Sequence, residues 1–236
     1  MRRNNASGSI AILYGFFLRT TIGLGLILLL GACNSPPLYG TKASKFLTEK
    51  GVPHTTILKL VEMSPLTAEE VALLSGFENV PTLHLLGSNP STPPELLARL
   101  AQHQVQDVRW GAATNPNTPL ELLLKLRTPG VYSTINGYLA RNPALPENVL
   151  REMYRSKEVS GSEIAMNPAC PIDVMREILE HGTDTDRAWL AWNRNLPHEI
   201  MQRLANDPSP DVARMLSGNP TYLRWKKLGS EKPATN

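Results

Sequence analysis

Cysteine is scarce in this chain, which has only Cys33 and Cys170 among its 236 residues. Cys33 ends an apolar N-terminal segment and is a predicted lipidation site, so Cys170 has no partner for an intramolecular disulfide. With Cys33 assigned to lipid, the single remaining thiol also excludes a thiolate metal cluster. We therefore expect no metal and no cofactor. Cys170 is interpreted as a small, inert residue at a helix start.

Catalytic motifs are missing as well. The chain has no Gly-x-Ser-x-Gly sequence and no phosphate-binding loop, and His198-Glu199 lacks the second histidine of a zinc-binding helix. The histidines share no position in the repeat described below; they are His54, His84, His103, His181 and His198. We therefore expect that the protein is not an enzyme. An envelope hydrolase is the least favoured of the three functions that we consider.

An excess of one charge is absent beyond the N-terminal segment. Residues 1–32 hold three arginines and no acidic residue, so the remaining chain balances 21 basic against 21 acidic residues. Steering towards nucleic acid needs a net positive field. We expect no nucleic-acid partner.

No apolar run is long enough to span a membrane. The longest, Thr20–Leu30, has about 11 residues, whereas a spanning helix needs about 20. Arg2, Arg3 and Arg19 precede it, which is typical of a secretory signal peptide. The ending Leu30-Gly31-Ala32-Cys33 resembles the bacterial lipobox, and this resemblance implies lipidation of Cys33. Asn34 in place of Asp implies outer-membrane sorting; an ordinary signal peptide or uncleaved anchor is the alternative.

The chain does contain a repeated motif: Asn, usually Pro, two residues, Pro, then an amphipathic run. The asparagines are 26, 27, 25, 26 and 26 residues apart. A fixed period of this size predicts a solenoid, in which each unit buries its apolar face against its neighbours. The copies begin at Asn89, Asn115, Asn142, Asn167, Asn193 and Asn219.

The first half of each unit predicts a helix of roughly ten residues. Proline stands four residues after each of the first five asparagines, which suits a helix start. Positions seven, eight and eleven are apolar and form one stripe. Thr92 with Glu95, and Thr118 with Glu121, match the capping-box spacing, as does Thr67 with Glu70.

The second half of each unit predicts a shorter helix packed closely against the stack. Only small residues stand two positions before each Asn, which indicates close backbone approach. They are Gly87, Ala113, Ala140, Ala165, Ala191 and Ser217. We expect the Asn side chains to bond neighbouring backbone at the turn; a ladder of ligand-binding amides is the alternative.

These residues resemble the leucine-rich repeat variant family, whose unit has a similar pattern. The nearest copy is Val108-Arg109-Trp110-Gly111-Ala112-Ala113-Thr114-Asn115-Pro116-Asn117-Thr118-Pro119. The resemblance implies alternating α- and 3₁₀-helices in a right-handed superhelix without β-strands. The family's founding member has a cysteine-ligated iron–sulfur domain, which these cysteines cannot supply. The expected fold is an all-α, right-handed solenoid of five to six repeats, with short helices of α or 3₁₀ type.

The predicted organisation has five parts. These are a signal peptide (1–32), a lipidated tether (33–44), an N-terminal helical cap with a degenerate repeat (45–82), the repeat solenoid (83–227) and a disordered tail (228–236).

Function is expected where the copies differ, one and four residues before each Asn. Trp, Tyr and Arg dominate binding hot spots, and they gather here in the central copies. The candidate partner-binding residues are Tyr138, Arg141, Glu163, Trp189 and Trp192 at these positions, together with Trp110, which is five residues before Asn115. Two alternatives stay open: Trp189 and Trp192 fill core space, or the tryptophans stack on carbohydrate.

The sequence thus favours a lipoprotein anchored in the cell envelope through Cys33, most simply in the outer membrane facing the periplasm. Its solenoid would be a protein–protein interaction module for an unknown envelope protein. A cell-wall or glycan-binding lipoprotein is the alternative.

Overall fold

The computed structural model describes residues 36–230, and within this range the chain forms fifteen α-helices and no strand. This confirms the all-α class. The described residues belong to one compact unit. The expected signal peptide, Cys33 and the end of the expected tail (231–236) lie outside the described residues. No helix in the described part combines the length and the apolar character needed to cross a membrane.

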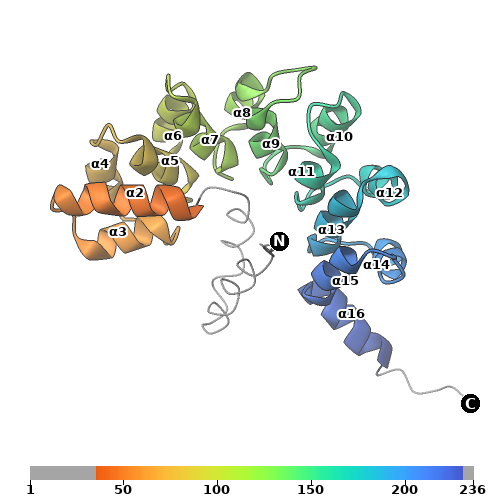
Figure 1. Cartoon of the computed structure of the whole chain (residues 1–236). Coiled ribbons are helices and arrows are strands. Elements are labelled where there is room, and N and C mark those ends of the chain that lie inside the picture. The colour runs from red at the N-terminus through yellow and green to blue at the C-terminus, as the bar shows by residue number, and fades with distance from the viewer. Residues whose placement is uncertain (1–35, 231–236) are drawn as a thin grey trace, which may run out of the picture. The chain divides into compact units, whose positions relative to one another are not determined.

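From residue 80 onward the helices alternate between two rows (Figure 1). The odd row consists of α5 (Val80–Ser88), α7 (Gln106–Thr114), α9 (Thr134–Ala140), α11 (Gly161–Ala165), α13 (Asp184–Trp192) and α15 (Pro210–Ser217). The even row consists of α6 (Pro94–Ala101), α8 (Leu120–Leu126), α10 (Glu147–Arg155), α12 (Ile172–His181), α14 (His198–Leu204) and α16 (Pro220–Ser230). Each odd-row helix contacts the next along the whole row.

The even-row helices begin where the repeated proline predicts. A proline is the N-cap residue of α6, α8, α10, α12 and α14, with extended backbone angles. Its fixed φ and missing N–H suit this position, because the first helical N–H groups have no partner within the helix. The apolar stripe that follows is largely buried, as Leu97, Leu150 and Ile178 illustrate. The sequence pattern therefore predicted these helices correctly.

The predicted capping boxes behave differently at different sites. Thr67 and Glu70 form a complete box at the start of α4 (Ala68–Ser75). Thr92 and Thr118 do not cap α6 and α8, contrary to the prediction. Thr118 Oγ1 donates to the carbonyl of Ala112 at 2.6 Å, and Thr92 Oγ1 donates to Leu86 in the same way. Both threonines are buried, and there a carbonyl at the end of an odd-row helix needs a donor.

The repeated asparagines form a continuous hydrogen-bonded ladder through the stack. In Asn142, Nδ2 donates to the carbonyls of Ala113 (2.7 Å) and Asn115 (2.9 Å) in the preceding copy. Its Oδ1 accepts from the backbone N–H of Ala144, two residues later, at 2.8 Å. Asn115, Asn167, Asn193 and Asn219 repeat this pattern. The expectation that they bond backbone is confirmed, and these amides are committed to structure.

The small residues beside the ladder mark close backbone contact, as expected. A Cβ added to Gly87 would lie 3.0 Å from the backbone nitrogen of Ala112 in the next odd-row helix. Gly111 is tighter, since its added Cβ would lie 2.3 Å from the carbonyl oxygen of His84. The odd-row helices are α-helical throughout the described residues, so the 3₁₀ alternation implied by the family resemblance is not seen. Units of about 26 residues leave room for full α-turns.

The N-terminal end departs from the predicted tether. Residues 36–44, expected as turn-rich chain, belong to helix α2 (Pro36–Glu49), which packs on α3 (His54–Val61) and α5. Ala43 and Leu47 are fully buried, and this burial stabilises a helix that turn-forming residues disfavour. The Tyr39 ring stacks on His84 at 4.2 Å, and its hydroxyl donates to Asp107. At the other end, α16 reaches Ser230, so residues 228–230 of the expected tail are helical.

Candidate functional site

The variable positions pack in pairs across consecutive odd-row helices. Trp110 of α7 stacks on Tyr138 of α9, with ring centroids 5.1 Å apart and planes 28° apart. One copy further on, Gly137 faces Glu163, and an added Cβ would lie 2.1 Å from Glu163 Oε1. One copy earlier, Gly111 faces His84. In all three pairs, a residue five positions before one repeated Asn contacts a residue four positions before the next.

Arg141 joins the aromatic pair. Its guanidinium carbon lies 5.9 Å from the centroid of the Tyr138 ring, a cation–π arrangement. Arg141 Nε is buried without a hydrogen-bond partner, and so is Trp110 Nε1. All three side chains are half-buried. We call Trp110, Tyr138 and Arg141 the aromatic–arginine cluster.

The other three predicted residues lie elsewhere on the odd row. The carboxylate of Glu163 accepts from the Ser160 backbone N–H at 2.8 Å and completes a capping box at the start of α11. Trp192 faces Gly218, whose added Cβ would lie 2.9 Å from the indole Cζ3. Trp189 packs against the core, and both tryptophans are half-buried. Within residues 36–230, no hydrogen bond, ion pair or ring contact joins these three side chains to the aromatic–arginine cluster.

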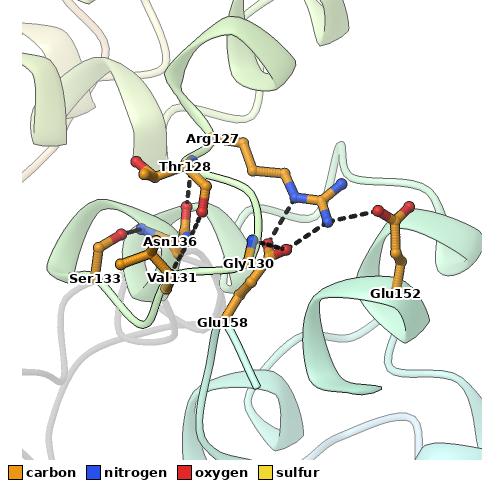
Figure 2. Close-up of polar contacts among 8 residues, drawn as sticks. All are labelled: Arg127, Thr128, Gly130, Val131, Ser133, Asn136, Glu152 and Glu158. Carbon is orange, nitrogen blue, oxygen red and sulfur yellow. Dashed lines mark hydrogen bonds and ion pairs between the residues drawn. The ribbon is translucent and has the colours of Figure 1, made fainter. Parts of the chain in front are cut away.

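Sequence reasoning missed a second feature, the 127–133 loop between α8 and α9 (Figure 2). Arg127 Nε donates to Glu158 Oε2 at 2.7 Å, and Arg127 Nη2 donates to Glu158 Oε1 and to Glu152 Oε1 at 2.8 Å each. Glu158 also accepts from the Gly130 N–H at 2.8 Å, and its side chain is only 1% exposed. Glu158 thus holds the turn at Pro129-Gly130 through the Arg127 side chain before it and the Gly130 N–H within it. Gly130 adopts a φ of +72°, a conformation that favours glycine.

Asn136 holds the same loop from inside α9. Its Oδ1 accepts from the Thr128 N–H at 2.9 Å, and its Nδ2 donates to the carbonyls of Thr128 and Val131 at 2.8 Å each. Asn136 is completely buried. Figure 2 shows these contacts and the Arg127 contacts on the same turn. The loop is therefore held by the amide of Asn136 on α9 and by the carboxylate of Glu158 in the linker between α10 and α11.

This rigid loop carries apolar side chains into solvent. Val131 is 51% exposed and Tyr132 is 62% exposed, and Leu120 and Leu124 of α8 are also exposed. The available sequence signal was the Pro129-Gly130 turn in the longest linker between an even-row and an odd-row helix. The Pro-Gly turn does not reveal that the loop is ordered, because Glu158, which holds the loop, is 31 residues after Arg127 in the sequence.

The ionisable groups near these features have shifted pKa values with clear causes. Hydrogen bonding to Arg127 lowers the pKa of Glu158, and the same bonds raise the pKa of Arg127. Burial lowers the pKa of His84. Burial also raises the pKa of the Cys170 thiol to about 12, which leaves it protonated and unreactive near neutral pH.

The described residues offer no geometry that points to metal chemistry, because nowhere in 36–230 do three His, Cys, Asp or Glu side chains gather as ligands. No protein-family model, curated protein or solved structure matches the chain. The functional argument therefore rests on the two features above: the aromatic–arginine cluster and the 127–133 loop.

Proposed function

We propose that this chain is a lipid-anchored protein of the cell envelope, without enzymatic activity, whose helices form a right-handed α-solenoid that binds another protein. The solenoid would comprise five to six repeats similar to those of the leucine-rich repeat variant family. The asparagine ladder supports this architecture, because each copy satisfies its polar backbone groups with the amide of the next. The anchor is Cys33, and the proposed location is the periplasmic side of the outer membrane.

The observation that carries the binding function is the 127–133 loop. Val131 and Tyr132 are exposed, yet the backbone beneath them is held by Arg127, Glu158 and Asn136. A rigid loop loses little conformational entropy on binding, so its apolar contacts translate into affinity. Tyrosine is enriched at the energetic centres of protein interfaces. The six candidate residues on the odd row would extend this surface.

The test is site-specific photocrosslinking in the native envelope. A photoreactive phenylalanine analogue replaces Tyr132 in the full chain, and a matched variant carries it at Gln202, an exposed residue of α14. We expect one discrete protein adduct at position 132 and none at position 202. Equal adducts at both positions, or none at 132, would contradict the proposal. An adduct removed by muramidase would instead support the cell-wall alternative.

The anchor has its own test. A Cys33→Ala variant should leave the membrane pellet and appear in the soluble periplasmic fraction, because one acyl-bearing residue supplies the attachment. Retention of this variant in the pellet would count against lipidation, and it would leave the crosslinking result unaffected.

A further inference from the structure

We infer that the aromatic–arginine cluster is a binding site for a carboxylate of an acidic peptide segment. This inference rests on the proposed function, because it names the chemistry of the protein partner. The site consists of the Trp110 indole N–H, the Arg141 guanidinium and the Tyr138 ring beneath that guanidinium.

The first reason is the pair of unsatisfied donors. Trp110 Nε1 and Arg141 Nε are buried, and neither has an acceptor. Buried donors in folded proteins are nearly always paired, since an unpaired one costs the free energy of its desolvation. Tyr138 contacts both side chains, so the two donors belong to one local cluster. The two side chains are otherwise half-exposed, so an acceptor that enters the cluster from solvent would satisfy these donors.

The second reason is the unbalanced charge of Arg141. Three other partly buried arginines in the described range pair with a carboxylate (Arg127 with Glu158, Arg151 with Asp173, Arg187 with Asp207), and Arg109 donates to the backbone carbonyls of His103 and Gln104. Arg141 has no such ion pair and instead lies over an aromatic ring. A guanidinium matches a carboxylate in both charge and shape, so this is the group that the site favours.

Arg194 provides a useful contrast. Its Nε is also buried without a partner, but no ring contact to Arg194 is found in residues 36–230. The ring at Arg141 orients the guanidinium and excludes water around it, which strengthens an ionic hydrogen bond. Only the Arg141 position therefore combines a cation, a ring and a second donor.

The geometry favours a peptide over a sugar. Carbohydrate recognition by aromatic residues uses open ring faces, but Trp110 and Tyr138 cover each other at 5.1 Å, and Arg141 lies over Tyr138. What remains for a ligand is the half-exposed guanidinium, with the buried indole N–H as a second donor behind it. These groups bind acceptor oxygens, which an aspartate or glutamate side chain supplies.

The experiment uses the full chain in detergent with 5-fluorotryptophan in place of its four tryptophans. The ¹⁹F signal of residue 110 is assigned with a Trp110→Phe variant. The probe is an acetylated decapeptide of alternating glycine and glutamate, compared with the same peptide carrying glutamine. We expect a saturable shift of the residue-110 signal with the glutamate peptide alone.

Variants then assign the shift to Arg141. Arg141→Gln should weaken binding at least about tenfold, which is the usual size of a hydrogen bond to a charged group. Arg99→Gln, which removes an exposed arginine from the even row, should leave affinity unchanged. If Arg141→Gln does not fold, Arg141→Lys keeps the charge but loses the Nε donor and the planar fork, and it should also bind more weakly.

Several outcomes would overturn the inference. They are no shift at saturating glutamate peptide, an equal shift with the glutamine peptide, undiminished affinity in folded Arg141 variants, or a response confined to peptidoglycan fragments. A lost crosslink at position 132 with an intact ¹⁹F response would refute the loop proposal alone. The two ideas can therefore fail separately.

Discussion

Different interactions link consecutive helices within the odd row and within the even row. Between odd-row helices, the backbones approach closely and buried asparagine amides cross from one copy to the next. Between even-row helices, the links include partly exposed ion pairs such as Arg151–Asp173, Arg155–Glu177 and Arg176–Glu199. Buried amide bonds cannot be exchanged for water, whereas exposed ion pairs can. The asparagine ladder and the close contacts of the odd row should therefore contribute more to stability than the ion pairs of the even row.

The largest effect should come from breaking the ladder. Asn142→Ala leaves the carbonyls of Ala113 and Asn115 and the N–H of Ala144 buried without partners. We expect a loss of about 3–6 kcal/mol in the free energy of unfolding, measured by urea denaturation. Asn117→Ala is the control, because this exposed amide also reaches the preceding copy, at Pro90. Equal losses of unfolding free energy in the two variants would show that the buried ladder amides contribute no more than an exposed amide.

The next effect concerns the Arg127–Glu158 pair, which links the loop after α8 to the segment after α10. Glu158→Gln leaves the Arg127 charge without its buried partner, which should cost about 3–5 kcal/mol at pH 7. The folded-state pKa of Glu158 is lowered, so its contribution is present above the unfolded pKa and is lost as the pH falls through the folded value. The difference between wild type and variant should therefore shrink in acid. A pH-independent difference would show that packing, not charge, stabilises the loop.

Close approach on the odd row can be probed with two glycines. Gly111→Ala places a Cβ against the His84 backbone, which cannot move without displacing α5, so we expect a loss of about 1–3 kcal/mol. Gly137→Ala meets the carboxylate end of Glu163, a side chain that can rotate away, and should cost less. Thermal unfolding of both variants tests the order. A costlier Gly137→Ala would mean that Glu163 is fixed in place.

The smallest effect should come from the even row. Arg151→Ala removes partly exposed ion pairs with Asp173 and Glu147, and it should cost less than about 1 kcal/mol. Raising the salt concentration should reduce this difference further, because exposed charges are screened. Urea denaturation at low and high salt provides the measurement. A cost as large as that of Asn142→Ala would show that both rows contribute equally.

Sequence reasoning succeeded where one residue type recurs for a local reason. The proline column predicted the starts of the even-row helices α6, α8, α10, α12 and α14, and the small column predicted close approach. It failed at Thr92 and Thr118, because capping-box spacing does not reveal that the hydroxyls face inward. It also failed at residues 36–44, since the burial of Ala43 and Leu47 against other helices outweighs local turn preference.

The candidate site was predicted only in part. Trp110 and Tyr138 meet because a position in one copy contacts a shifted position in the next, and column-by-column comparison does not show that register. Arg141 joins them from the C-terminal end of the helix that carries Tyr138. The same register explains why Glu163 faces Gly137, whereas Trp192 and Gly218 stand at the same position of consecutive copies. The loop was missed because its ordering depends on Glu158, which is distant in sequence from Arg127.

The sequence by itself determined the period, the helix starts and the residues available to the core, because each depends on neighbours a few positions away. Only the tertiary structure decided which side chains meet across copies, which asparagine oxygens and nitrogens find partners, and which apolar residues remain exposed on a rigid loop. The physical reason is that these contacts join residues about 26 positions apart, and their register is set by backbone packing.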